Sequence, residues 1–478
     1  MGSRGVRAVG RALFALALLC GVAGTHPLET ETTGTSSGSA ADVFALLLGA
    51  PHKVHGSGFP SAVQLANFEA RVRAWSERQG DADRPAIVAH PQFGLGNRIS
   101  SVVSSLALAL ITDRRFFIEW GEHFSPLFST PFDSVPPRAL IPSTSDILDL
   151  SASSPSLGSF ANATACGSVD ALLPTNVTHL LSDQYFLPLL LANSEARARL
   201  AALFTPLDSP SDEEGVESAS GEGGEESAGL GAAQGEEVGE AGLFATLGRW
   251  ALQPSEEVRR AVLAFELGMG GRCVVGVHVR VPMFDWEHRQ VPDVDPEEAL
   301  QCARRAFLSQ LRHQAANSTS ARGEHDDASS TGGGSSGGVV FVASTSEAVR
   351  MRAREMFAKR GAWTSGATGR LEPGGAGEKQ ALMDLILLSR CQEIVSSVHS
   401  TFSYAAHALA GVTPWVVSSR SPPPHGGGGG RASVSKCIRA TGPEPCFHAG
   451  QSLRPQVSCA SPRGEQTENS RRDESCWY

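Results

Sequence analysis

Apolar and polar residues along the chain follow a pattern typical of buried strands joined by amphipathic helices. Near residue 86 a short apolar run, "AIVAH", precedes a helical pattern over 98–111 and a second run, "RRFFIEW". Two strands with a helix between them predict a βαβ unit.

The same alternation resumes after residue 251 and continues to about residue 417. We predict strands at 273–280, 339–344, 393–398 and 414–417, and helices at 296–312, from Glu347, at 378–390 and at 401–410, with Gly411 ending the last helix. Strands that alternate with helices predict two doubly wound Rossmann-like α/β domains. Such folds bind ligands at the carboxyl ends of their strands.

Three segments contain too few large apolar residues to pack, and we interpret them as insertions: 208–240, 314–338 and 420–432. The expected organisation is a signal peptide or short signal anchor (1–24), a stem with a helical region (25–80), an N-terminal α/β domain (81–250), a C-terminal α/β domain (251–450) and a cysteine-containing tail (451–478).

The distribution of charge along the chain argues against one class of partner. The formal charge of −10 comes from 208–240, which holds eleven acidic and no basic residues, and the remainder carries about +1. A nucleic-acid partner that needs a basic face is therefore not expected.

The N-terminal segment, three arginines followed by an apolar run over 12–23, is typical of a secretory signal that is either cleaved or retained as a membrane anchor. Eight cysteines follow Cys20 and are expected to form disulfides in an oxidising compartment.

Three stretches at predicted strand ends could carry chemistry. In "GLGNRI", Gly94 and Gly96 would allow a sharp turn that exposes backbone N–H groups at a helix start. The pattern lacks the third glycine of a dinucleotide fingerprint, so a bare strand-to-helix turn is the alternative.

In "VGVHVRVPMFDWE", His278 and Arg280 share one face at the end of a strand. Arginine can bind a pyrophosphate with two hydrogen bonds. The alternative is an arginine that forms an ion pair with Asp285 or Glu287.

In "SSVHSTFSY", hydroxyls gather at a strand end that precedes a helix. Ser400 is placed as an N-cap, and Ser396, Ser397, Ser400 and Thr401 could together form a phosphate or nucleoside site.

These stretches also carry a family resemblance. The blocks "GLGNRISSVVSSLALALITDRRFFIEW", "SPLFSTPF", "SDQYFLPLLL", "VVGVHVR", "VVFVAS", "HSTFSYAAHALAGVTPWVV" and "EPCFH" occur in an order that resembles the plant xyloglucan α-1,2-fucosyltransferase family. His399 departs from that pattern, because tryptophan usually precedes "STF".

The resemblance implies a GT-B-like fold of two domains facing a cleft, and an inverting transfer of L-fucose from GDP-fucose to a hydroxyl of a cell-wall polysaccharide or glycoprotein glycan. It implies no metal cofactor and a location in the Golgi. Carried over by position, Arg280 would hold the pyrophosphate beside His278. Other substrate-binding residues would be Gly94, Gly96, Asn97, Arg98, Ser344, Thr345, Ser400, Thr401 and Phe402.

A carboxylate could assist the acceptor hydroxyl as a base, and Asp183 in "SDQYF" and Asp285 are the candidates. Both could instead be structural. Two rival hypotheses remain: an α-1,6- or protein O-fucosyltransferase, or a secreted glycan-binding pseudoenzyme. The expected partners are GDP-fucose and a glycan acceptor, with no nucleic acid and with membrane anchoring at the N-terminus as one alternative.

Overall fold

The computed structural model describes residues 58–129, 146–151, 154–206, 238–269, 273–281, 294–320, 338–359, 361–364, 376–397, 400–418, 436–440 and 442. The predicted signal segment, the stem, Asp285 and the cysteine-containing tail lie outside these ranges. No helix in the described ranges is both long enough and apolar enough to cross a bilayer.

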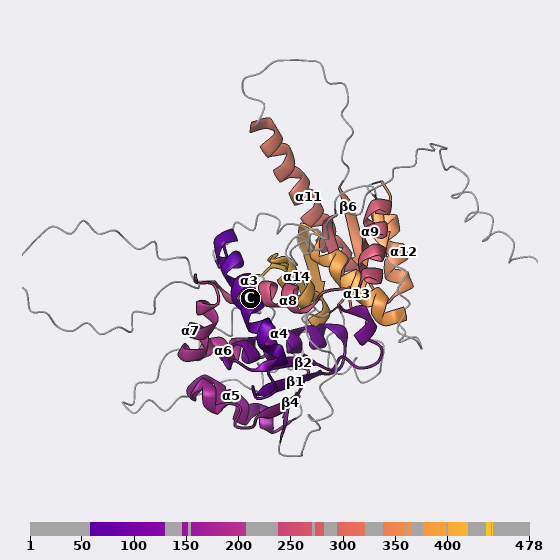
Figure 1. The fold of residues 1–478 in the computed structure, drawn as a ribbon. Helices are drawn as coiled ribbons and strands as arrows, with labels where there is room; N and C mark the ends of the chain where they lie inside the picture. The colour runs from indigo at the N-terminus through magenta and orange to yellow at the C-terminus, as the bar shows by residue number, and fades with distance from the viewer. Residues whose placement is uncertain are drawn as a thin grey trace, which may run out of the picture. The chain divides into compact units, whose positions relative to one another are not determined.

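The helices and strands follow one another in two α/β series (Figure 1). The α-helices are α3 (Ala62–Glu77), α4 (Leu95–Ile111), α5 (Ser156–Cys166), α6 (Leu187–Ala192), α7 (Ser194–Ala202), α8 (Glu240–Ala251), α9 (Glu256–Met269), α11 (Pro296–Ser320), α12 (Glu347–Met356), α13 (Ala376–Ser389) and α14 (Thr401–Ala410). The strands are β1 (Ala86–Pro91), β2 (Arg115–Ile118), β3 (Ile147–Leu150), β4 (Val177–Ser182), β5 (Cys273–His278), β6 (Val339–Ala343), β7 (Ala362–Thr364), β8 (Glu393–Ser397), β9 (Trp415–Ser418) and β10 (Lys436–Arg439).

The first sheet has four parallel strands in the order β2-β1-β4-β3. Chain order reverses between β1 and β4, because β1 connects to β2 on one side while β4 lies on the other. Doubly wound sheets bind ligands beyond the strand ends at such a switch point.

The second sheet has six strands in the order β7-β6-β5-β8-β9-β10, with β10 antiparallel to β9. Numbered from β5, this order is 3-2-1-4-5-6, which is the Rossmann order. Its switch point lies between β5 and β8. The two Rossmann-like sheets confirm the predicted fold class.

Helix α4 contacts both the first sheet and the helices of the second. It packs on β1, β2 and β4 and also on α8, α13 and α14. Its four serines turn inward without leaving hydroxyls exposed, and Ser104 accepts hydrogen bonds from the backbone N–H groups of Phe186 and Leu187. The largest core cluster therefore includes residues of both sheets, such as Phe116 and Phe341.

Most predicted elements of both halves are confirmed, with shifted ends. Helix α4 begins at Leu95 instead of at residue 98, so most of "GLGNRI" lies inside the helix. Helix α11 continues to Ser320, past the predicted end at residue 312, and α8 begins at Glu240, the last residue assigned to the acidic insertion.

The cysteines in the described ranges form disulfides, as predicted. Cys273 is bonded to Cys391 and Cys302 to Cys437, while Cys166 is also disulfide-bonded. The first bond joins the start of β5 to the residues before β8. The second joins α11 to β10.

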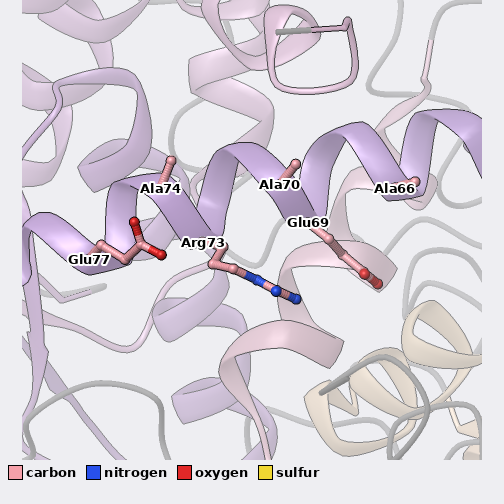
Figure 2. Close-up of a pocket in the computed structure, with 6 residues that line it drawn as sticks. All are labelled: Ala66, Glu69, Ala70, Arg73, Ala74 and Glu77. Atoms are coloured by element: carbon pink, nitrogen blue, oxygen red, sulfur yellow. The ribbon is translucent and has the colours of Figure 1, made fainter. Parts of the chain in front are cut away.

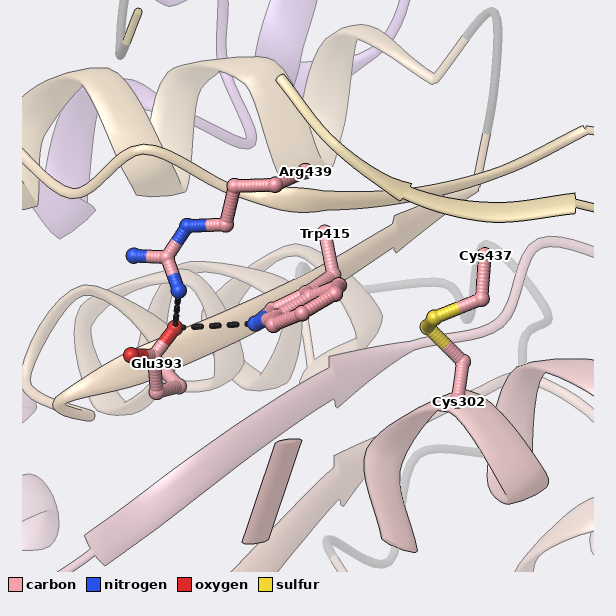
Figure 3. Close-up of a disulfide and its surroundings, with 5 residues drawn as sticks. All are labelled: Cys302, Glu393, Trp415, Cys437 and Arg439. Carbon is pink, nitrogen blue, oxygen red and sulfur yellow. Dashed lines mark hydrogen bonds and ion pairs between the residues drawn. A yellow bond between two sulfur atoms is a disulfide. The ribbon is translucent and has the colours of Figure 1, made fainter. Parts of the chain in front are cut away.

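A buried carboxylate near the second disulfide joins three strands (Figure 3). Glu393 on β8 accepts hydrogen bonds from Trp415 Nε1 on β9 at 3.0 Å and from Arg439 on β10 at 2.6 Å. Its other oxygen accepts from Gln310 on α11. Because the carboxylate is 6% exposed, these partners replace the water that it loses on folding.

Replacing Glu393 with alanine should lower the free energy of unfolding by about 3 kcal/mol, since three donors lose a charged acceptor. Urea unfolding under non-reducing conditions measures the change. As a control, Glu257→Ala removes an exposed carboxylate that pairs with Lys379, and it should cost about 0.5 kcal/mol. Equal effects of the two substitutions would show that Glu393 does not hold these strands together.

Candidate functional site

The residues predicted at strand ends lie at the two switch points. Gly94 and Arg98 follow β1, and Asp183 follows β4 in the first sheet. His278 ends β5 and Ser397 ends β8 in the second sheet. Each pair of strands therefore presents predicted residues at its carboxyl ends.

Gly96 brings the two groups together. A Cβ atom on Gly96 would lie 2.4 Å from the carbonyl carbon of Thr401 and 2.5 Å from the backbone nitrogen of Phe402. The first turn of α4 therefore touches the backbone at the start of α14, and only glycine permits this approach. The motifs "GLGNRI" and "STF" are about 300 residues apart in the sequence but in contact in the fold.

Gly94 has a different role from the one we expected. Its φ of −69° suits any residue, and a Cβ atom there would meet nothing within 4 Å. The left-handed residue in this turn is Phe93, with φ of 59°. The sharp turn thus occurs at a phenylalanine.

The guanidinium of Arg98 holds this turn in place. Its Nε donates to the carbonyl of Phe93 at 2.7 Å, and one terminal nitrogen donates to the carbonyls of Pro91 at 2.6 Å and Trp120 at 3.0 Å. The guanidinium also lies over the ring of Phe124. Burial lowers the pKa of Arg98, while the carboxylate of Glu378 acts in the opposite direction. A part in substrate binding stays a prediction for Arg98.

Asn97 and Asp183 are the other predicted site residues near the carboxyl ends of the first sheet. Asn97 is half-buried on α4, and its side chain has no hydrogen bond among the residues that the structure describes. Asp183 is buried and accepts a hydrogen bond from Gln184 Nε2 at 2.6 Å. The backbone of Gln92 donates to Ser182, so Asp183 lies beside the turn that precedes α4.

His278 packs against the start of α14. Its Nδ1 lies 3.3 Å from the hydroxyl of Ser400, and its ring centroid lies 4.8 Å from that of Phe402. Burial, and then the positive charge of Arg280, lower the pKa of His278 to about 3. The imidazole is therefore neutral at physiological pH and offers a packing surface and one ring nitrogen beyond the Ser400 contact.

Two serines fix the end of β5. Ser397 donates to the carbonyl of His278 at 3.0 Å and accepts from the backbone N–H of Arg280 at 3.2 Å. Ser344, at the end of β6, donates to the carbonyl of Val279 at 2.9 Å. The hydroxyls of Ser397 and Ser344 thus position Arg280, whereas Thr345 is exposed.

The hydroxyl site that we expected around "SSVHSTF" is largely used within the protein. Ser396 donates to Ser403 at 2.7 Å, and both are fully buried with Ser397. Ser400 is the N-cap residue of α14, as predicted, but its hydroxyl makes no capping hydrogen bond. The N–H groups at this helix start thus lack a side-chain cap, and such groups favour an anion.

Several polar groups of this region were not predicted from the sequence. His90 Nε2 and His179 Nδ1 are 2.9 Å apart, and His90 Nδ1 lies 3.0 Å from Glu119. Burial lowers the pKa of His90, with Glu119 opposing it. The alternation of β1 and β4 could have placed both histidines on one face, but β4 was not predicted.

A hollow along α3 carries no comparable chemistry (Figure 2). It is lined by side chains of this one helix: Ala66, Glu69, Ala70, Arg73, Ala74 and Glu77. None of the predicted site residues lines it. The described residues also contain no group of three or more histidine, cysteine or acidic side chains placed to hold a metal ion.

The sequence matches the model of one known protein family. A family model described as xyloglucan fucosyltransferase matches residues 69–163 and 239–456, more than half of the chain. The chain belongs to the xyloglucan fucosyltransferase family. Both motifs that meet at Gly96 fall inside the matched segments of this family.

Relatives within this family are distant in sequence. A galactoside 2-alpha-L-fucosyltransferase of Pisum sativum is 24% identical over 417 residues, which cover 78% of this chain and 63% of the pea protein. Fucosyltransferase 2 of Arabidopsis thaliana is 23% identical, covering 88% of this chain and 76% of the relative. The chain thus spans less than two thirds of the length of the pea relative.

Among solved structures, a variant of Arabidopsis thaliana FUT1 in complex with GDP is similar in fold. Its TM-score is 0.50 at 19% identity, covering 82% of this chain and 86% of the FUT1 chain. This likeness shows the GT-B-like fold.

Gly96→Ala should destabilise the protein by about 3 kcal/mol, because the new methyl group overlaps backbone atoms that no rotamer change can move. Gly94→Ala is the matched control two residues away and should leave stability unchanged within about 0.5 kcal/mol. Thermal and urea unfolding of both variants measure the difference. A stable Gly96→Ala protein would contradict the close approach of α4 and α14.

The low pKa of His278 should make stability depend on pH. Between pH 6.5 and about 3 the unfolded chain binds a proton at this residue and the native protein does not, so the free energy of unfolding falls as pH falls. The decrease from pH 7 to pH 4.5 should be smaller in His278→Asn than in the wild type. Urea unfolding at both pH values tests this, and equal decreases would show that His278 titrates normally.

Proposed function

We propose that this protein is an inverting fucosyltransferase that moves L-fucose from GDP-fucose to a hydroxyl of a cell-wall polysaccharide or glycoprotein glycan, forming an α-1,2 linkage. The observation that carries the proposal is the contact at Gly96, which brings the helix that follows β1 against the start of the helix that follows β8. Family membership and the name of the pea relative support fucosyl transfer and the linkage, and the GDP bound to the FUT1 variant supports the donor.

The donor would bind on the second-sheet side. The guanidinium of Arg280 and the uncapped N–H groups at the start of α14 would bind the two phosphates of GDP. The rings of His278 and Phe402 pack against each other and would line one side of this donor site. The phosphate charge would then be neutralised by Arg280, since the imidazole is neutral. Ser344 and Ser397 act as positioning residues, because their hydroxyls bond to the carbonyl and the N–H of the peptide group that joins Val279 to Arg280.

The acceptor would bind on the first-sheet side, near Asn97 and Asp183. In the transfer, an acceptor hydroxyl oxygen forms a bond to C1 of fucose on the face opposite GDP, while the bond from C1 to the phosphate oxygen breaks. The bonding pair leaves with GDP, whose developing charge Arg280 stabilises. The hydroxyl proton passes to a base, and Asp183 is the candidate among the described residues.

We further propose that the protein acts in the Golgi and needs no metal ion. The secretory-type N-terminal sequence and the disulfides support an oxidising compartment. Activity that persists in EDTA would support metal independence.

The decisive experiment is incubation of the purified protein with GDP-fucose and a panel of oligosaccharides, including galactose-terminated xyloglucan fragments. Arg280→Ala should lower kcat/KM by about 100-fold or more, because the leaving diphosphate loses its cation. Arg354→Ala, which removes an exposed arginine on α12, is the control and should retain activity. Absence of turnover by the wild type on every acceptor would favour a glycan-binding pseudoenzyme. Transfer to a different hydroxyl would correct the linkage alone.

A further inference from the structure

Helix α12 carries three arginines, and one of them is buried. Arg350 is 5% exposed, whereas the side chains of Arg352 and Arg354 are about half exposed. Removing a guanidinium from water is costly unless protein acceptors replace the lost water. An apolar side chain of similar volume often stabilises a buried position equally well, so stability alone does not explain an arginine here.

The side chain of Arg350 joins the end of β6 to the first turn of α12. Its Nε atom donates to Oε2 of Glu347 at 3.0 Å, and one terminal nitrogen donates to the same oxygen. The other terminal nitrogen donates to the carbonyl of Ser344 at 2.6 Å. The side chain of Glu347 is 58% exposed, so the ion pair links a buried cation to a carboxylate that water reaches. Arg350 therefore restrains the backbone of Ser344.

Ser344 carries this restraint to the neighbouring strand. Its hydroxyl donates to the carbonyl of Val279 at 2.9 Å. The same peptide group ends in the N–H of Arg280, which donates to Ser397. The direction of a serine hydroxyl depends on the position of its own backbone, and Arg350 holds the carbonyl of that serine. A continuous set of hydrogen bonds thus connects Arg350 with the peptide group before Arg280.

We propose that Arg350 is a positioning residue for the diphosphate of the donor, acting through Ser344 on the backbone that carries Arg280. Each of its three guanidinium nitrogens donates to a protein group, and Glu347 neutralises its charge. Its contribution is therefore orientation and not direct attraction of phosphate. This inference rests on the proposed transfer from GDP-fucose and adds to it a residue that does not touch the substrate.

Arg350→Met removes the donor to Ser344 and keeps a long apolar side chain. It should weaken GDP binding, measured by calorimetry, by about tenfold and lower kcat/KM for GDP-fucose by at least about tenfold, because a displaced binding group loses its alignment. The acceptor KM should change by less than about threefold, since the acceptor would bind on the other sheet. Arg350→Lys keeps one donor without the planar fork and should recover GDP affinity to within about threefold of the wild type.

The matched control is Arg352→Met, two residues along the same helix. It removes an exposed arginine that pairs with Glu297 and should change neither GDP affinity nor kcat/KM. Thermal unfolding identifies a temperature at which all variants are folded, and the assays are run there. If Arg350→Met does not fold, Ser344→Ala tests the same set of hydrogen bonds without removing a charge, and it should weaken GDP binding by a similar factor.

A double-mutant cycle with Arg280→Ala separates positioning from a general loss of structure. If Arg350 acts through Arg280, Arg350→Met should weaken GDP binding by less than about twofold in the Arg280→Ala protein. A tenfold loss in both backgrounds would show that Arg350 does not act through Arg280, and the proposal would be wrong.

GDP binding and fucose transfer make the two levels of inference distinguishable. If the wild type turns over GDP-fucose and Arg350→Met keeps the wild-type GDP affinity and kcat/KM, the positioning role is wrong and the proposed function stands. If the wild type binds GDP but transfers fucose to no acceptor, the proposed function fails. Weaker GDP binding by Arg350→Met and not by Arg352→Met would then still support the positioning role.

Discussion

The close approach between the start of α4, which follows β1, and the start of α14, which follows β8, is the constraint on which the proposed site depends. Gly96 in α4 lies against the backbone of Thr401 and Phe402, so no side chain separates the two switch points. Because α4 also packs on the first sheet and on α8, α13 and α14, the contact is fixed by the core and not by loops alone. A side chain at Gly96 would separate the groups that follow β1 from those that follow β5 and β8.

The polar groups around this contact fall into two kinds. Ser344, Ser396, Ser397 and Ser403 are buried and bonded within the protein, and they join strand ends to one another and to α14. The N–H groups at the start of α14, by contrast, receive no cap from the side chain of Ser400. Buried serines that are bonded within the protein would preorganise the proposed donor site, because the ligand would not have to order these groups itself.

Apolar patterning predicted the Rossmann-like halves because strands such as β5 and β6 are continuous apolar runs. It missed β4, whose sequence "VTHLLS" includes a buried histidine and two polar residues, and it missed the short edge strands β7 and β10. Edge strands gain most of their stability from pairing, which composition does not reveal.

For the site, motifs indicated which segments matter but not how their atoms are used. The glycines of "GLGNRI" looked equivalent, yet one is free of contacts and the other is essential to a contact with residues 300 positions away. Likewise, the hydroxyls of "SSVHSTF" suggested a ligand site. In the structure, Ser396 and Ser397 instead donate hydrogen bonds to other groups of the protein. Tertiary contacts set these roles, and a single sequence does not record them.

The disulfide between Cys273 and Cys391 bears on how the chain tolerates its long insertion. It ties together the amino ends of β5 and β8, the two strands whose carboxyl ends flank the switch point, across a sequence separation of 118 residues. Because the cost of closing a loop grows only with the logarithm of its length, lengthening this covalently closed segment by a few tens of residues costs about a few tenths of a kcal/mol. An insertion between two elements of this closed segment therefore costs the pairing of β5 with β8 almost nothing.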